Sequence, residues 1–198
     1  MRSMVLTVPM AICLSALACS RLVAQAQPAA KTGAFPLSVG AGLSDYDVDW
    51  GHGRMLGGTV WLDFQPPKLP AWLNGLGAEI EARDISLNHS PSQPSNYRED
   101  TLGGGAIYTV NRYRSFRPYG KFLASFGSMD FRTSSPGYSH ETRTVYAPGG
   151  GIEVKVYRGF WARADYEYQF WPQLLGGTAD PQGFTVGFMV DLRDVRRP

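Results

Sequence analysis

The chain has 198 residues, of which 43% are hydrophobic and 18% are charged, and this length fits one domain or two small ones. Its formal net charge is +2, with 19 bases against 17 acids. If the first 26 residues are removed, Arg2 and Arg21 are lost and 17 bases balance 17 acids. This balance argues against a nucleic-acid partner, because nucleic-acid-binding proteins normally carry a basic excess.

Residues 1–26 have the pattern of a secretory signal peptide. Arg2 gives a positively charged start, residues 4–18 form an uncharged apolar run, and an A-x-A pattern ends at Ala26. The apolar run contains Pro9 and has about 15 residues, which is too short for a comfortable membrane-spanning helix. No later segment is long and apolar enough for such a helix either. We therefore expect an exported protein without transmembrane helices.

Both cysteines, Cys13 and Cys19, lie inside this leader. The exported chain would then have neither a disulfide nor a thiol nucleophile. The residues before Cys19 also resemble the cleavage box of a lipoprotein, although Ala16 stands where leucine is usual. Cleavage before Gln27 is the preferred interpretation, and residues 27–34 would then form a short linker.

The rest of the chain alternates apolar and polar residues with a period of two, which is typical of β-strands. Successive side chains of a strand point to opposite faces, so each segment would have one apolar and one polar face. In the segment 160–171, for example, Phe160 and Ala162 share the apolar face, while Arg163 and Asp165 lie on the other. Eight such segments of about ten residues predict strands at 36–45, 56–65, 76–87, 101–111, 118–127, 146–157, 160–171 and 183–192.

The connections between these segments alternate between long and short. Four of them are long and polar, at 46–55, 88–100, 128–145 and 172–182. The connections near 112–117 and 158–159 are tight, and only the one at 66–75 is longer than this alternation predicts. In an up-and-down barrel, alternate connections lie at the same end. The short-turn side also collects seven arginines and Lys68 against a single acid, Asp194, which suits contact with anionic phospholipid.

The alternation alone fits two opposite barrels. A secreted lipocalin-like barrel would turn its apolar face inward around an apolar ligand, whereas a membrane barrel would turn it outward into lipid. The strand length matches the roughly 9–11 residues that a tilted strand needs to cross a bilayer. Aromatic residues near strand ends also suit the membrane interface. These residues are Tyr46, Trp50, Trp72, Tyr119, Tyr157, Trp161, Phe170 and Trp171.

The favoured prediction is therefore an all-β fold, an eight-stranded antiparallel up-and-down transmembrane β-barrel. Its last segment, GFTVGFMVDL at 183–192, resembles the final strand of outer-membrane barrels. Over residues 35–192 the chain resembles the eight-stranded outer-membrane β-barrel family, the porin-like or outer-membrane-protein-A-like barrels. That family usually ends on an aromatic residue, whereas here a basic tail at 193–198 follows Leu192.

This resemblance implies a bacterial outer-membrane location, with outer-membrane lipids and the barrel-assembly machinery as partners. It also implies a monomer that needs no cofactor. Functions within the family differ widely, so the resemblance implies a fold and a location before it implies a role. The preferred role is structural or surface-interacting, with specificity in the long loops.

The predicted lumen is strongly charged. An eight-stranded barrel is just wide enough for side chains to fill it, and buried charges must pair. We therefore expect an internal ion-pair network that plugs the barrel, and the alternative is a small gated path for water or ions. The predicted network comprises Asp63, Glu79, Glu81, Arg83, Lys121, Glu153, Lys155, Arg163, Asp165, Glu167 and Asp191.

No catalytic, cofactor-binding or metal-binding residue is predicted. The histidines His52, His89 and His140 fall in three long loops and are expected to be ordinary solvated residues. Some eight-stranded barrels modify lipid A at that rim, so a lipid-A-modifying enzyme acting through His89 or His140 is the alternative. Residues 45–56 lack the glycine and the glutamate that a calcium-binding loop requires. We therefore expect the protein not to be an enzyme.

Overall fold

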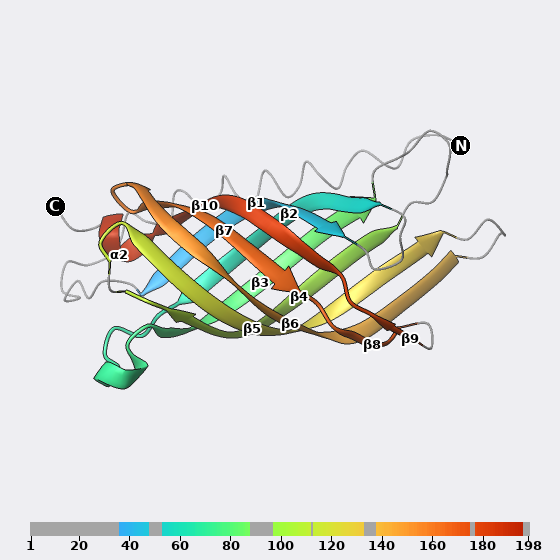
Figure 1. Cartoon of the computed structure of the whole chain (residues 1–198), viewed down its shortest axis with the longest axis horizontal. Coiled ribbons are helices and arrows are strands. Elements are labelled where there is room, and N and C mark those ends of the chain that lie inside the picture. The colour runs from blue at the N-terminus through green and yellow to red at the C-terminus, as the bar shows by residue number, and fades with distance from the viewer. Residues whose placement is uncertain are drawn as a thin grey trace, which may run out of the picture. The chain divides into compact units, whose positions relative to one another are not determined.

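The structure, a computed structural model, describes residues 36–47, 53–87, 97–111, 113–132, 138–174 and 177–195. The predicted signal peptide (1–26), the linker (27–34) and Cys19 lie outside these residues. Within them, eight strands form a closed antiparallel barrel in up-and-down order, in which β1 pairs with both β2 and β10 (Figure 1). The barrel strands are β1 (Leu37–Asp47), β2 (Arg54–Phe64), β3 (Leu76–Leu87), β4 (Arg98–Thr109), β5 (Phe116–Arg132), β6 (Tyr138–Tyr157), β7 (Phe160–Tyr168) and β10 (Gln182–Asp191).

The predicted fold class is confirmed, and closure gives every barrel strand a neighbour on both sides. Three short elements complete the structure. They are the 3-10 turn η2 (Ala71–Leu73), the two-stranded sheet of β8 (Trp171–Leu174) and β9 (Gly177–Ala179), and the helical turn α2 (Leu192–Val195). In Figure 1, α2 lies at one end of the barrel and β8–β9 at the other. We call these the short-turn end and the long-loop end. No helix within the described residues is long and apolar enough to cross a membrane.

Two segments predicted as loops contain strands instead. The predicted loop 128–145 is largely a hairpin, because β5 continues to Arg132 and β6 begins at Tyr138. The predicted loop 172–182 contains most of β8 and all of β9. Polar residues on both faces hid the β5–β6 extension from a search for alternation, but its backbone hydrogen bonds form regardless of side-chain polarity.

The apolar faces of the strands point outward and the charged faces inward. Leu43, Phe126 and Phe188 on the outer wall are 77%, 74% and 64% exposed, whereas Lys121 and Arg163 are buried in the lumen. This arrangement is the reverse of a lipocalin, so the lipocalin-like alternative is wrong and the favoured orientation, with the apolar face outward, is confirmed. Half of the aromatic residues expected at the lipid interface also face inward and are buried, namely Tyr46, Tyr119, Trp161 and Trp171.

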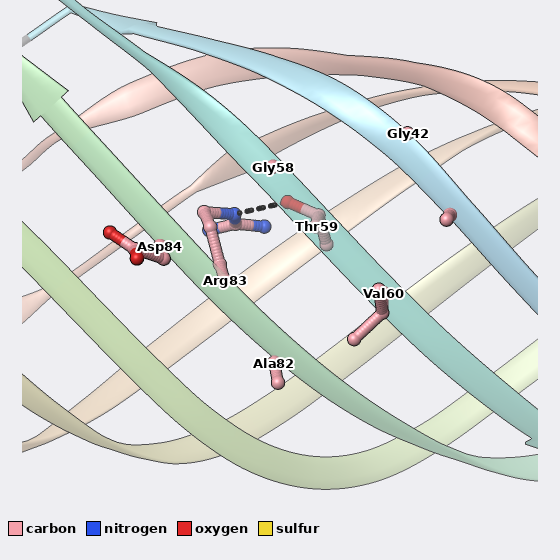
Figure 2. Close-up of a pocket in the computed structure, with 8 residues that line it drawn as sticks. Gly42, Gly58, Thr59, Val60, Ala82, Arg83 and Asp84 are labelled. Carbon is pink, nitrogen blue, oxygen red and sulfur yellow. Dashed lines mark hydrogen bonds between the residues drawn. The ribbon is translucent and has the colours of Figure 1, made fainter. Parts of the chain in front are cut away.

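The outer wall has a hollow where small side chains of β1, β2 and β3 meet (Figure 2). Its volume is about 470 Å³, and outward-facing Ala41, Gly58, Val60 and Ala82 line it, with Asp84 at its edge. A side chain on Gly58 would meet only one atom within 4 Å, at 3.9 Å. The hollow therefore opens on the wall that faces hydrocarbon, although the lumen residues Thr59 and Arg83 also contribute to its lining.

Candidate functional site: the charged lumen

The lumen has room for large charged side chains because glycines stand opposite them. An added Cβ on Gly40 would lie 2.3 Å from the Trp61 ring, and one on Gly105 would lie 1.9 Å from the backbone oxygen of Phe122. Such contacts are too close for any side chain larger than hydrogen. Glycine runs in β4 and β6 are therefore packing positions inside a narrow barrel.

Lys121 lies at the centre of the network. Its Nζ is 2.6 Å from Glu81 Oε2, 3.0 Å from Glu167 Oε2, and 3.3 Å from both Glu79 Oε1 and Asp165 Oδ2. The side chain has no exposed surface. One ammonium thus joins β5 to β3 on one side and to β7 on the other.

Arg163 on β7 forms a second centre nearer the short-turn end. Its guanidinium nitrogens lie 2.7 Å from Glu79 Oε2, 3.2 Å from Asp63 Oδ2 and 3.3 Å from Asp165 Oδ2. Arg163 Nε also donates to Tyr119 Oη at 2.7 Å, and Tyr119 Oη donates to Asp165 Oδ2 at 2.9 Å. Tyr119 of β5 thus bonds to both members of the Arg163–Asp165 ion pair of β7, and connected hydrogen bonds of this kind strengthen one another.

Arg83 on β3 forms a third centre, nearer the long-loop end. Its Nη1 lies 2.7 Å from Glu167 Oε1 and its Nη2 donates to Glu81. Its Nε donates to Thr59 Oγ1 at 3.2 Å, the hydrogen bond drawn in Figure 2. The guanidinium also stacks 4.3 Å from the centroid of the Tyr46 ring. Glu81 and Glu167 are shared between Arg83 and Lys121, so the centres form one connected network.

A smaller cluster closes the short-turn end. Arg117 Nη1 lies 3.3 Å from Asp191 Oδ2 and 3.7 Å from Glu153 Oε2, and Arg193 Nη2 lies 2.8 Å from Asp191 Oδ2. The Arg117 guanidinium carbon is 3.3 Å from the centroid of the Trp161 ring. These contacts hold Arg117 and Arg193 across the short-turn end of the lumen.

The long-loop end of the lumen is covered by apolar side chains instead. Tyr97 packs against two clusters of buried side chains there. One cluster comprises Met129, Val145, Trp171, Leu174 and Ala179, and the other comprises Tyr46, Met55 and Ile85. An apolar cap of this kind lowers the local dielectric constant, which strengthens the ion pairs below it.

Ten of the eleven residues predicted for the lumen take part in these ion pairs. The exception is Lys155, which is half-buried with its Nζ 5.3 Å from the Trp161 ring centroid. Arg117 falls in the predicted tight connection near 112–117 and Glu99 in the predicted loop 88–100, but both are buried in the lumen. Their odd numbers match the inward residues of their strands, so extending the alternation would have found them. Neither Glu99 oxygen has a hydrogen-bond partner among the described residues.

A second polar cluster lies on the outer face of the β5–β6 hairpin. Asp130 pairs with His140, and Ser128 with Thr142, across the ladder. His140 Nδ1 is 2.6 Å from Asp130 Oδ1, and its Nε2 is 3.2 Å from Thr142 Oγ1. Ser128 Oγ lies 3.4 Å from His140 Nδ1. His52 and His89 lie outside the described residues. Among the described residues, no three His, Cys, Asp or Glu side chains are arranged to hold a metal ion.

Comparison with known proteins gives matches to outer-membrane β-barrel proteins. The family model described as outer membrane protein beta-barrel domain matches residues 11–191. Neisserial surface protein A is similar in structure, with a TM-score of 0.61 and 14% identity over 78% of this chain and 95% of that one. The Yersinia pestis outer membrane protein Ail in a bilayer nanodisc has a TM-score of 0.51 and 15% identity, over 78% and 97%. None of the curated proteins matches the chain.

Proposed function

Because the chain belongs to the outer membrane protein β-barrel domain family and is located in the bacterial outer membrane, we propose that it serves there as a monomeric, non-enzymatic anchor. In this role the lumen is closed by its ion-pair network, and the long-loop end contacts molecules outside the cell. The barrel-assembly machinery would insert it, and outer-membrane lipids would surround its wall.

The contacts of Lys121 carry the closed-lumen part of the proposal. A path for ions through the barrel would have to separate Lys121 from four carboxylates and Arg163 from three. Breaking a single buried pair costs roughly 3–5 kcal/mol, because the partner is left charged and buried. The apolar cap around Trp171 adds a second barrier above the network.

The β5–β6 hairpin supports the surface role. With 17 and 20 residues, β5 and β6 are much longer than β7, with nine. The extra length carries polar side chains on its outer face, so it extends past the apolar band. In outer-membrane barrels the short turns face the periplasm and the longer loops face outward, which would place this hairpin outside the cell.

Two measurements test this proposal. The purified protein in a planar lipid bilayer should show no steady ionic current, and a stable open level would overturn the closed lumen. For orientation, Cys13 and Cys19 are replaced by serine and one new cysteine is introduced. Thr142→Cys should react with a membrane-impermeant maleimide on intact cells, whereas Lys68→Cys should react only after the outer membrane is permeabilised. The opposite pattern would overturn the surface role.

The cluster around His140 favours one second candidate, a hydrolase of acyl esters in lipid A. Asp130 would hold the Nδ1–H of His140, so that Nε2 can remove the proton from the hydroxyl of Thr142. The Thr142 oxygen would bond to the ester carbon and the lipid alcohol would leave with that proton. Water would then hydrolyse the acyl-threonine and release a fatty acid. Phe126 of β5, two residues from Ser128, is 74% exposed, so the cluster borders the lipid-facing wall.

The mass of lipid A from cells that express the protein separates the two candidates. An anchor leaves this mass unchanged in cells with the unaltered protein and with His140→Ala. A loss of one acyl chain that disappears with His140→Ala and Asp130→Asn would favour the hydrolase. Thr144→Val, on the same outward face of β6, is the matched control and should behave as the unaltered protein does.

A further inference from the structure

The connection between β2 and β3, residues 65–75, is unusually long for the short-turn end. Figure 1 shows its 3-10 turn η2 projecting to one side of the barrel end that also carries α2. The base of this connection is fixed to the barrel. Thr109 N donates to Gly75 O at 2.8 Å, and Gln65 Nε2 donates to Thr109 Oγ1 at 2.9 Å. Gly75 has a φ of +111°, and a Cβ there would lie 2.1 Å from Thr109 O.

The chain between these fixed points is stiff, and its tip is apolar. Pro66, Pro67 and Pro70 restrict the backbone on the way to η2. Trp72 at the tip is 76% exposed, and no residue of η2 is buried. An indole held away from the barrel gains nothing from the protein core. Its apolar area is therefore available to whatever surrounds that end of the barrel.

The surroundings of this tip are aromatic and cationic. Outward-facing Phe64, at the end of β2 from which the connection departs, is 44% exposed. The next turn around the barrel, at 110–115, and the strand ends beside it expose the rings of Tyr108, Tyr113 and Phe116. Tyr157 is exposed beside the 158–159 turn, on the opposite side of the same barrel end. The cations Lys68, Arg114 and Arg158 are exposed at the same end, and the described residues of these three connections include no acid.

Given the orientation proposed above, we propose that the 65–75 connection lies in the headgroup region of the periplasmic leaflet, where Trp72 inserts and Lys68 contacts the phosphate of acidic phospholipids. Two observations select a lipid surface over a protein partner. The connection continues the lipid-facing wall of β2 and β3, and the charges exposed on the described residues of the three connections at this end are all positive. Indole rings favour the bilayer interface, and cations next to it attract anionic headgroups.

Tryptophan fluorescence in vesicles tests the proposal. The full-length protein is inserted into phosphatidylethanolamine–phosphatidylglycerol vesicles (3:1) whose chains are brominated near the headgroup or near the bilayer centre. The difference between the unaltered protein and Trp72→Phe isolates the Trp72 signal. Bromines near the headgroup should quench that signal more strongly than bromines at the centre. Trp171→Phe, which removes an indole from the apolar cap, should leave the quenching difference intact.

A Trp72 signal that iodide in the buffer quenches, and that brominated lipid does not, would overturn the proposal and leave a periplasmic protein as the candidate partner. Lys68→Glu tests the charge part separately. This variant should weaken the lipid quenching of Trp72 in the vesicles with phosphatidylglycerol and have no effect in phosphatidylcholine vesicles. Equal quenching of Lys68→Glu and the unaltered protein in both vesicle types would overturn the contact with acidic lipid.

Discussion

The lumen and the outer wall of this barrel are built from alternate residues of the same strands, yet they are held together differently. In the lumen, three cations bridge strands that are not neighbours in the ladder, as Lys121 does between β3 and β5 and between β5 and β7. On the wall, charged pairs such as Arg98–Asp84 join neighbouring strands and are more than half exposed. Replacing a charged residue should therefore change the free energy of unfolding greatly in the lumen and little on the outer wall.

The largest expected effect is that of Arg163→Met. Methionine keeps most of the side-chain volume but leaves Asp63, Glu79 and Asp165 without their shared cation. We expect a loss of roughly 3–5 kcal/mol in the free energy of unfolding, because the buried Asp63 loses its cation and the buried Glu79 and Asp165 keep only Lys121. The measurement is urea unfolding in vesicles, together with the temperature at which the barrel loses its SDS-resistant gel mobility. An unchanged unfolding curve would show that the network contributes nothing to stability.

The next largest effect is expected from the lumen glycines. In Gly105→Ala the new methyl group would lie 1.9 Å from a backbone oxygen of β5, so the two strands must separate. Overpacking of this kind costs about 3 kcal/mol. Gly58→Ala on the outer wall is the matched control, since its nearest neighbour is 3.9 Å away. The same unfolding measurement should show a change of no more than about 0.5 kcal/mol for that control. Equal effects would contradict the difference between the two faces.

These two faces also show how far the sequence could lead. Period-two alternation predicted that Glu79, Glu81 and Lys121 share the lumen, because side-chain direction is a local property of a strand. The partners of Lys121 were not predictable in this way. Contacts across the barrel depend on how far each strand is shifted along its neighbours, and that shift is set when the sheet closes.

The errors made from the sequence have a common origin. Glu99 and Arg117 were assigned to connections because they lie just outside the segments in which the apolar–polar alternation is clear. Both lie in the lumen because the inward–outward alternation does not stop where the apolar band ends. The aromatic residues show the converse, because Tyr46 and Tyr119 were read as interfacial but donate hydrogen bonds to lumen carboxylates. Residue type alone did not predict which of these side chains face the lumen. Their odd or even position along the strand predicts it, because successive side chains point to opposite faces.

A smaller effect, of opposite sign, is expected from Glu99→Gln. The carboxylate is fully buried between the ion-pair network and the apolar cap, and neither oxygen has a hydrogen-bond partner among the described residues. A neutral amide of the same shape removes the cost of holding a charge there. We expect the free energy of unfolding at pH 7 to rise by about 1 kcal/mol. A clear loss of stability in the urea experiment would show instead that Glu99 balances the positive charge of Arg83.

The smallest effect is expected on the outer wall, where Arg98→Met provides a counterpart to Arg163→Met. Arg98 donates two hydrogen bonds to Asp84, at 2.8 and 3.0 Å, and this geometry is as good as any in the lumen. The pair is more than half exposed and lies among polar outward residues at the long-loop ends of β3 and β4, beyond the apolar band, so water replaces each lost bond and the expected change stays below about 1 kcal/mol. A double-mutant cycle with Asp84→Asn measures the coupling directly, and added salt should reduce it. A coupling as large as that of the buried pairs would mean that burial is not what separates the two faces.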